Sequence, residues 1–257
     1  MNEKRKLRPV LQLQNVAKKY GDDQALAAVS LDVYPGEILS VIGPNGAGKT
    51  TLLQIAAGYM TADEGRVFLY DKDRTNQLNV LNRHVAVVFG GSRGFYRNSS
   101  VLSNLVFFAT LMGIPQKERK SRIEKVLGDT ALLEHADKKV SALSMGLLQR
   151  LHIARGLLKE TPVLLLDEPT NGVDAKTAVA IRQLIKKIAL GGRAIILTSH
   201  QLHEVSDLAD RIQLLYQGHF SFEGSVAELA EASGLKRIDR PATLEESYLA
   251  LIDQLGG

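Results

Sequence analysis

The sequence contains no cysteine and no long apolar run. Without cysteine, the chain has neither a disulfide framework nor a thiolate metal site, which is typical of a reducing compartment. A membrane-spanning helix needs about 18 to 20 consecutive apolar residues, and the densest segments, Val101–Met112 and Val163–Leu166, are too short. No apolar stretch follows the basic N-terminus MNEKRKLRP, so a secretory signal peptide is not predicted. We therefore expect that this chain does not itself cross a membrane.

The composition is that of a folded globular protein. The chain has 257 residues, of which 45% are apolar, enough to build the core of one large domain or two small ones. Its formal net charge of +4 is a mild excess. Such a charge permits an anionic ligand or a position next to a membrane, but it does not demand nucleic acid. We expect no nucleic-acid partner.

Apolar periodicity predicts strands in the N-terminal part of the chain. Val10–Val16 and Val29–Tyr34 alternate with period two, and Glu37–Gly43 is typical of a more buried strand. A glycine-rich turn then leads into a helix predicted at about Gly48–Gly58. Further strand-like runs lie at Arg66–Tyr70, Val85–Phe89, Val163–Leu166, Ala194–Thr198 and Ile212–Tyr216.

The middle of the chain changes character. Ser99–Met112, Gln116–Leu133 and Met145–Lys159 have helical spacing with no strand among them, which predicts an all-helical insert at about residues 90–160. The later strands alternate with helices, as a parallel sheet requires. A helical tail is predicted at about 225–257, interrupted by Pro241. We expect one α/β domain spanning 1–257.

The stretch GPNGAGKTT, Gly43–Thr51, predicts a phosphate-binding loop. It fits G-x-x-x-x-G-K-[ST], follows a strand and opens a helix, so that backbone N–H groups and the positive end of the helix face an anion. Lys49 would reach the β- and γ-phosphates, and the Thr50 hydroxyl would ligate Mg²⁺. The alternative is a glycine-rich turn without a ligand. The predicted ATP-binding residues of this loop are Gly43, Pro44, Asn45, Gly46, Ala47, Gly48, Lys49, Thr50 and Thr51.

Two carboxylates follow a short apolar strand in TPVLLLDEPT, Thr161–Thr170. Because a site is expected at the carboxyl ends of parallel strands, Asp167 is a candidate Mg²⁺ ligand. Glu168 is a candidate base that accepts a proton from an attacking water. Taken alone, such a pair is often only a solvated strand end.

Further motifs follow in a characteristic order. LSMGLLQR (Leu143–Arg150) precedes the acidic pair, NGVD (Asn171–Asp174) follows it, and AIILTSH ends at His200. Tyr20 lies just before GDDQAL. Together with the phosphate loop, these residues resemble the ATP-binding-cassette ATPases, the nucleotide-binding subunits of ABC transporters. The resemblance implies a P-loop NTPase fold with a RecA-like core, an N-terminal antiparallel β portion and an all-helical signature subdomain.

The resemblance also implies roles for these residues, with ATP and Mg²⁺ as cofactors. Tyr20 would stack on adenine, and His200 would contact the γ-phosphate and the attacking water, beside Lys49 and Glu168. Two copies, or a pseudo-dimer, would enclose ATP so that Ser144 and Gly146 bind the γ-phosphate held by the other subunit. The signature departs from its commonest form at Met145 and Leu147. Alone, LSMGLLQR would be an N-capped amphipathic helix.

The stretch VVFGGSRGFYRN, Val87–Asn98, occupies the position of the family's coupling loop. There the family carries a glutamine that reaches Mg²⁺ and the attacking water, whereas this chain has glycine at both candidate positions, Gly90 and Gly91. The following large side chains are then expected to be exposed and to face a partner. An ordinary aromatic-anchored surface loop is the alternative. The residues concerned are Arg93, Phe95, Tyr96 and Arg97.

The tail TLEESYLAL (Thr243–Leu251) and GGSRGFY resemble the exporter branch of the family, the ABC-2 and multidrug type. This implies an ATP-hydrolysing subunit, peripheral on the cytoplasmic face of the cell membrane, that powers export through a separate integral membrane permease. An import ATPase remains an alternative, as does a soluble ABC ATPase of translation or repair. A P-loop GTPase or nucleotide kinase is disfavoured because no N-K-x-D motif is present.

Overall fold

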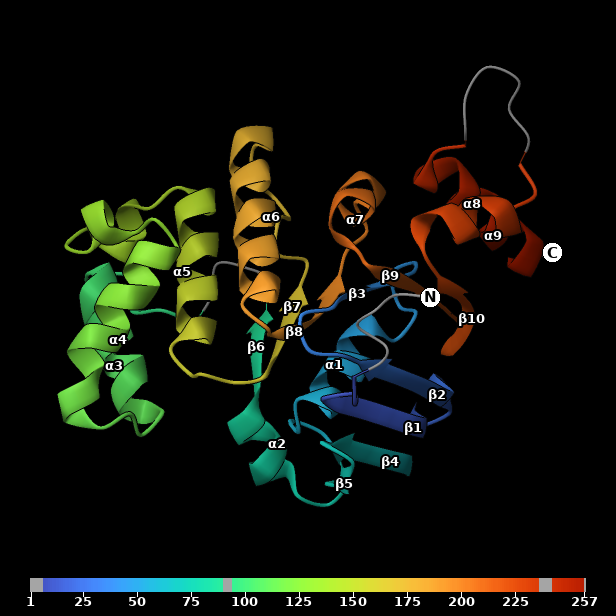
Figure 1. Cartoon of the computed structure of the whole chain (residues 1–257), viewed down its shortest axis with the longest axis horizontal. Coiled ribbons are helices and arrows are strands. Elements are labelled where there is room, and N and C mark those ends of the chain that lie inside the picture. The colour runs from blue at the N-terminus through green and yellow to red at the C-terminus, as the bar shows by residue number, and fades with distance from the viewer. Residues whose placement is uncertain (1–6, 90–93, 236–241, 257) are drawn as a thin grey trace.

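The computed structural model of the chain describes residues 7–89, 94–235 and 242–256 (Figure 1). The strands of this part are β1 (Leu11–Tyr20), β2 (Asp23–Val33), β3 (Ile38–Ile42), β4 (Glu64–Leu69), β5 (Lys72–Asp73), β6 (Val85–Phe89), β7 (Val163–Asp167), β8 (Ala194–Thr198), β9 (Arg211–Tyr216) and β10 (His219–Gly224). The α-helices are α1 (Lys49–Ala56), α2 (Leu78–His84), α3 (Val101–Leu111), α4 (Gln116–Asp129), α5 (Met145–Leu157), α6 (Ala175–Leu190), α7 (Leu202–Leu208), α8 (Val226–Ala232) and α9 (Leu244–Gly256). Short 3-10 turns lie at Leu133–His135 and Val140–Ala142.

The N-terminal sheet is antiparallel, in the order β2-β1-β4-β5. Its central strand β1 buries Leu11, Leu13 and Val16, a spacing that departs from strict alternation. The shift comes from Asn15, whose φ of +48° produces a bulge in the pairing with both neighbouring strands. Gly65 on β4 leaves room for it, because a Cβ there would lie 2.4 Å from the Asn15 carbonyl oxygen.

The second sheet has the order β10-β9-β3-β8-β7-β6, in which only the edge strand β10 is antiparallel. Every residue of β3 and β8 is buried, which fits their largely apolar character, interrupted only by Ser40 and Thr198. Since parallel strands end at the same edge, the segments after β3, β7 and β8 meet there. The phosphate loop, the acidic pair and His200 are thereby brought to one edge of this sheet.

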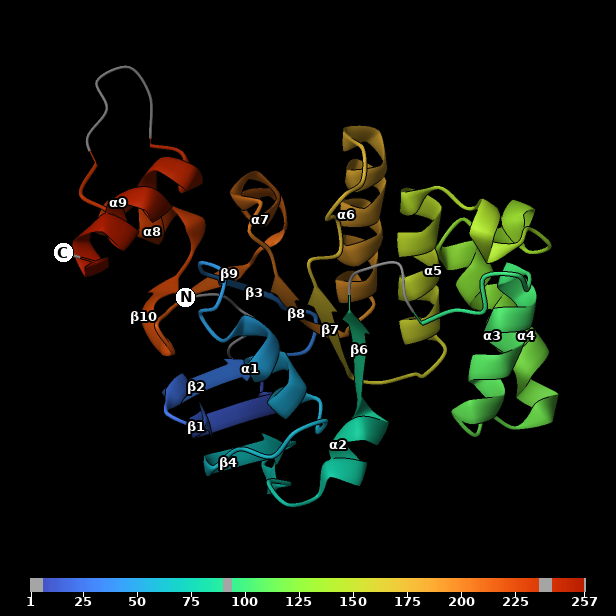
Figure 2. The ribbon, with the colours of Figure 1, turned by 180° about the vertical axis from the view of Figure 1, so that it is seen from behind.

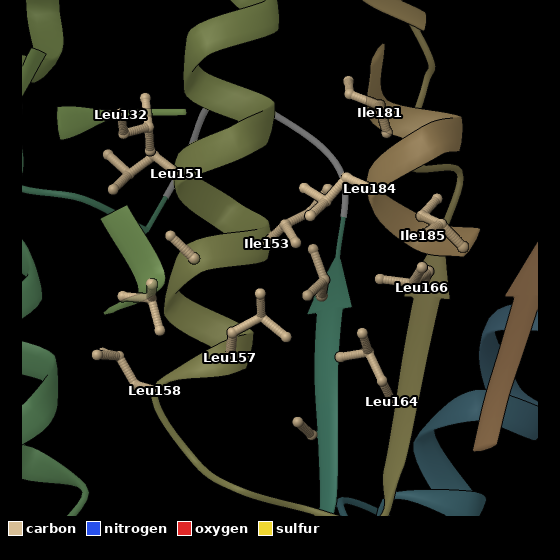
Figure 3. Close-up of a cluster of buried hydrophobic side chains, with 14 of the residues drawn as sticks. Leu132, Leu151, Ile153, Leu157, Leu158, Leu164, Leu166, Ile181, Leu184 and Ile185 are labelled. Carbon is tan, nitrogen blue, oxygen red and sulfur yellow. The ribbon is translucent and has the colours of Figure 1, made fainter. Parts of the chain in front are cut away.

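The three helices expected between Ser99 and Lys159 are present as α3, α4 and α5. Helix α5 lies against β6 and α6, and Gly156 permits the approach, because a Cβ there would lie 2.7 Å from Val88 Cγ2. Figure 3 shows the apolar cluster that joins these elements. Its labelled members from α5, α6 and β7 are Leu151, Ile153, Leu157, Ile181, Leu184, Ile185, Leu164 and Leu166.

The C-terminal helices α8 and α9 lie at the opposite end of the molecule from α3 and α4 (Figures 1 and 2). Leu244 of α9 is buried in a cluster with Ile42, the last residue of β3, and Leu202, the first residue of α7. Tyr248 packs against the same cluster. The tail therefore packs against β3, which leads into the phosphate loop, and against α7, which follows His200. Among the described helices, none combines the length and apolarity needed to cross a bilayer.

Candidate functional site

A cavity of about 820 Å³ opens at the carboxyl edge of the parallel strands. It is bounded by the end of β1, the phosphate loop with the start of α1, the segment after β7 and the first turns of α5. Residues far apart in the sequence therefore share one concave surface. The residues lining it are Tyr20, Ala25, Asn45, Gly46, Gly48, Lys49, Thr50, Thr51, Met145, Gln149, Asp167, Glu168, Asn171 and Gly172.

The phosphate loop needs glycine at the position before α1. Gly48 has φ +105°, and a Cβ there would lie 2.3 Å from the carbonyl oxygen of Ala25 on β2. No side chain caps the start of α1. The first N–H groups of this helix have no partner within it and lie at the cavity, so they are suited to bind an anion.

Lys49 folds back onto its own loop. Its Nζ donates to the carbonyl oxygens of Gly43, at 2.7 Å, and Pro44, at 2.9 Å. Burial lowers the pKa of the Lys49 ammonium, while the carboxylates of Glu168 and Asp167 act to raise it. A polyanion in the cavity would offer this cation stronger acceptors than the two carbonyls.

Asp167, at the end of β7, is held in place from the neighbouring strand. Thr198 Oγ1 on β8 donates to Asp167 Oδ1 at 2.5 Å, and Thr50 Oγ1 lies 3.4 Å from Asp167 Oδ2. The Thr50 hydroxyl and the Asp167 carboxylate are hard oxygen donors on adjacent elements, the kind that Mg²⁺ prefers. The residues present therefore fit a magnesium ion.

Both carboxylate oxygens of Glu168 have a partner. Asn171 Nδ2 donates to Oε2 at 2.8 Å, and His200 Nδ1 lies 3.0 Å from Oε1. The backbone of Glu168 has φ +48°, and its N–H donates to the Thr198 carbonyl oxygen at 3.1 Å. A left-handed backbone at a glutamate is uncommon and costs about 1 kcal/mol or more, so the surrounding contacts hold it there.

Most of the predicted site residues line this cavity, but some lie elsewhere. Gly43 and Pro44 line a smaller cavity of about 170 Å³, together with His200 and Tyr248. Asn45 borders both cavities. The side chain of Ala47 is buried in the core instead. Tyr20 borders the large cavity at the end of β1 and is 47% exposed, as a stacking platform requires.

Ser144 and Gly146 are not among the residues that line the cavity of their own chain. Ser144 is the N-cap of α5, where its hydroxyl oxygen accepts from the Leu147 N–H at 3.3 Å. Gly146 is buried against α6, and a Cβ there would lie 2.3 Å from Thr177 Cγ2. A side chain at 146 would collide with α6 unless Thr177 moved, so helix packing favours glycine there. Met145, between the two, does line the cavity and is 46% exposed.

Sequence reasoning missed several residues that the structure brings to the site. Gln149 and Met145 line the cavity, Thr198 orients Asp167, and Asn171 orients Glu168. Asn171 and Thr198 lie inside the NGVD and AIILTSH motifs, so the motifs themselves were the signal. Gln149 lies four residues after Met145 on α5, and that helical spacing was a signal that the two share a face.

Part of the aromatic stretch was read wrongly. Gly90, Gly91 and Arg93 lie outside the described residues. Phe95 was expected to be exposed, but its ring packs edge-on against Phe108 and His152, at centroid distances of 5.6 and 4.6 Å. The reason is that α3, which follows closely in sequence, and α5, about 50 residues further on, partly bury the ring.

Arg155 of α5 strengthens this packing. Its guanidinium lies 4.9 Å from the Phe95 ring centroid and donates to the Gly94 carbonyl oxygen at 3.2 Å. Tyr96, in contrast, is 57% exposed, and Arg97 is exposed as well. Only these two of the expected side chains remain available to a partner within the described residues.

Comparison with known proteins identifies the family. The family model described as ABC transporter matches residues 26–171. The chain belongs to the ABC transporter family. It is the ATP-binding subunit of an ABC transporter and an ATP hydrolase. The GTPase and nucleotide-kinase alternatives are therefore wrong.

Its relatives include transport ATPases of different kinds. The chain is 29% identical over 227 residues to the ABC transporter ATP-binding protein NatA of Bacillus subtilis, covering 87% of this chain and 92% of NatA. It is 34% identical over 225 residues to the spermidine/putrescine import ATP-binding protein PotA of Vibrio cholerae, covering 87% of this chain and 59% of PotA. These relatives share the ABC family, but their names do not give one common direction of transport.

Solved structures confirm the P-loop NTPase fold. A dimeric post-hydrolysis state of the ATP-binding cassette MJ0796 bound to ADP and Pi is 30% identical, with a TM-score of 0.74, covering 84% of this chain and 98% of that one. A nucleotide-free cassette of an ABC transporter is 26% identical, with a TM-score of 0.77, covering 85% and 92%.

Proposed function

We propose that this ABC ATPase powers export of a substrate through a separate integral membrane subunit, to which it binds at the cytoplasmic face. The single observation that carries the catalytic part is that Lys49, Thr50, Asp167 and Glu168 all line one cavity. A cation, a hydroxyl and two carboxylates converge there, which is the set that phosphoryl transfer to water requires.

Different residues of the cavity bind the adenine and the phosphates of ATP. Tyr20 offers a half-exposed aromatic ring to the adenine, and the N–H groups at the start of α1 receive the phosphates. Lys49 exchanges its carbonyl partners for the β- and γ-phosphate oxygens. Thr50 and Asp167 hold Mg²⁺, which neutralises phosphate charge when bound.

Glu168 takes the proton in hydrolysis. A water in line with the γ-phosphate donates its proton to the Glu168 carboxylate as its oxygen bonds to phosphorus, and the bond to the ADP oxygen breaks. Asn171 and His200 each hold one oxygen of this carboxylate. They fix its orientation before the substrate arrives, so less reorganisation is needed in the transition state.

A second subunit completes each site. Ser144 is exposed at the N-terminus of α5, outside the cavity of its own chain. We assign Ser144 and Gly146 to the γ-phosphate bound by the partner, in a sandwich of two chains and two ATP molecules. The relative MJ0796 has been seen as a dimer, which supports this arrangement.

The membrane subunit docks beside the aromatic stretch. Tyr96 and α3 together expose apolar side chains, with Tyr96 and Phe107 in ring contact at 4.9 Å. Exposed aromatic and aliphatic groups are the anchors of protein interfaces. The exposed apolar side chains of α3 are Leu102, Val106, Phe107 and Leu111.

Export is the favoured direction because TLEESYLAL and GGSRGFY resemble the exporter branch. Import is the second candidate, favoured by the 34% identity to the importer PotA. The test is purification of the chain with its membrane subunit, followed by reconstitution in vesicles with the ATPase on the outside. ATP-driven uptake by such vesicles corresponds to export from a cell, whereas ATP-driven loss of a preloaded substrate corresponds to import. Purification of the chain without any membrane partner would contradict the proposed docking to a separate membrane subunit.

A further inference from the structure

Gln149 is a buried residue in the wall of the ATP cavity. It lies on α5 one turn after Met145, both residues line the cavity, and only 4% of Gln149 is exposed. Its Nε2 has no hydrogen-bond partner within the described part of the chain. Gln149 is thus a nearly fully buried side chain that lines the cavity and whose Nε2 donor is unused.

Packing alone does not account for a glutamine here. Leaving a buried amide unpaired costs about 1 to 3 kcal/mol, and an apolar side chain of similar size would avoid that cost. The neighbouring residues on α5 that face the core, Leu148 and Leu151, are apolar and well buried. A hydrogen-bond partner gained in another state of the protein would account for the amide of Gln149.

The position of Gln149 indicates what this partner is. Met145, one turn before Gln149 on α5, lies beside Gly172, because a Cβ on Gly172 would be 4.0 Å from Met145 Cγ. Gly172 follows the acidic pair by four residues, and the acidic pair lines the same cavity. The Asn171 amide is already engaged with Glu168. Phosphate oxygens are strong acceptors, and hydrogen bonds to charged groups are the stronger kind.

We infer that Gln149 donates from Nε2 to the γ-phosphate of ATP, and so makes the site distinguish ATP from ADP. This inference rests on the proposed assignment of the cavity to ATP. It adds a nucleotide contact from the first turns of α5 within the same chain, distinct from the contact assigned to Ser144 across the dimer. Nucleotide with a terminal phosphate would thereby draw α5 toward the phosphate loop.

The test compares the full chain with Gln149→Leu, using a non-hydrolysable ATP analogue, AMP-PNP, and ADP in separate titrations. We expect about tenfold weaker binding of AMP-PNP, as loss of a hydrogen bond to a charged group predicts, and ADP affinity within about twofold of the unmodified chain. Gln149→Glu, which places a negative charge at the same point, should weaken AMP-PNP binding further. Gln183→Leu on α6 is the matched control, since that glutamine is exposed.

Thermal unfolding without nucleotide separates this role from a structural one. Gln149→Leu removes an unpaired amide, so the nucleotide-free chain should be as stable as the original or more stable, while AMP-PNP should stabilise it less. An equal loss of AMP-PNP and ADP affinity, or an unchanged affinity for both, overturns the inference. Lys49→Ala tests separately whether the cavity binds ATP. If Lys49→Ala also leaves AMP-PNP binding intact, then the assignment of the cavity to ATP is wrong, and not only the contact from Gln149.

Discussion

Glu168 combines an uncommon backbone conformation with a fully engaged carboxylate. Its left-handed φ directs the side chain to the cavity, while Asn171 and His200 occupy its two oxygens. An amide at this position can keep a similar shape, but it cannot accept the proton of a water. Replacing Glu168 by glutamine should therefore affect ATP hydrolysis without affecting ATP binding.

We predict that Glu168→Gln slows ATP turnover by about 10²-fold or more while ATP affinity changes little, because the lost function is proton acceptance. Steady-state phosphate release and equilibrium binding of ATP measure the two quantities. Glu124→Gln, at an exposed position on α4, is the control. Near-normal turnover in Glu168→Gln would remove this residue from the role of base.

At the scale of a single element, the start of α6 depends on one titrating residue. Asp174 is its N-cap, with Oδ1 accepting from the Thr177 N–H at 3.0 Å and Oδ2 accepting from the Thr177 hydroxyl at 2.6 Å. The hydroxyl bond holds the pKa of Asp174 below its ordinary value. Because the folded-state pKa is depressed, this stabilisation is present above the unfolded pKa and is lost as pH falls through the folded pKa.

Asp174→Asn should therefore flatten part of the acid dependence of unfolding, since asparagine keeps the cap without titrating. The measurement is the thermal unfolding midpoint of both proteins between about pH 6 and pH 2, across the ordinary aspartate pKa of about 3.9. The unmodified chain should lose stability relative to Asp174→Asn on acidification. A difference between the two midpoints that stays constant over this range would contradict the assignment.

The segment before α3 carries two aromatic residues with different tasks. Phe95 packs under Arg155 against Phe108 and His152, so Phe95→Ala should lower the free energy of unfolding by about 2 to 3 kcal/mol. Tyr96 is exposed, and Tyr96→Ala should lower it by less than about 1 kcal/mol. Denaturant unfolding gives both values.

Co-purification with the membrane subunit completes this prediction. Tyr96→Ala should weaken the association while ATP binding by the isolated chain is kept, because its ring lies on the proposed docking surface. If Tyr96→Ala remains fully associated and transport is normal, the segment is an ordinary surface turn anchored by Phe95.

Elements with strong periodicity could be predicted closely. The strand runs at Val85–Phe89 and Ala194–Thr198 match β6 and β8 residue for residue. The hairpin strand β10 was missed although Phe220 and Phe222 alternate with polar side chains, because two half-buried apolar residues make only a short signal. Gln217 and Gly218 both have positive φ, as in a two-residue hairpin turn, and Gly218 was the sequence signal for that turn.

Some residues of the candidate site could be predicted from the sequence and others could not. The phosphate loop and the acidic pair could be predicted because each is a contiguous motif whose residue types indicate its chemistry. The burial of Phe95 could not, because it depends on which face of α5 meets another element. The spacing of Gln149 from Met145 indicates a shared helix face, but it does not show that this face borders the cavity. Contacts between distant segments are a property of the fold and leave little trace in a local pattern.

At the scale of the whole molecule, the proposed sandwich separates two kinds of defect. Lys49→Ala removes a charge from the chain's own cavity and should weaken ATP binding by the monomer. Ser144→Arg acts at an exposed helix N-terminus outside that cavity, so monomer binding should persist while ATP-driven dimerisation is lost. Titration and light scattering, with Glu168→Gln as the background, measure the two effects. Equal loss of monomer binding in both variants would contradict the sandwich.

The cluster that anchors α9 also has a consequence for how the molecule unfolds locally. Leu244 shares its core with Ile42, just before the phosphate loop, and Leu202, just after His200, while Tyr248 borders the small cavity between those loops. Segments that share a core open together as one cooperative unit. Amide hydrogen exchange in α9 should therefore slow when ATP orders the loops, although no residue of α9 touches the large cavity. Exchange in the tail helix would then report nucleotide binding at a site that the helix does not touch.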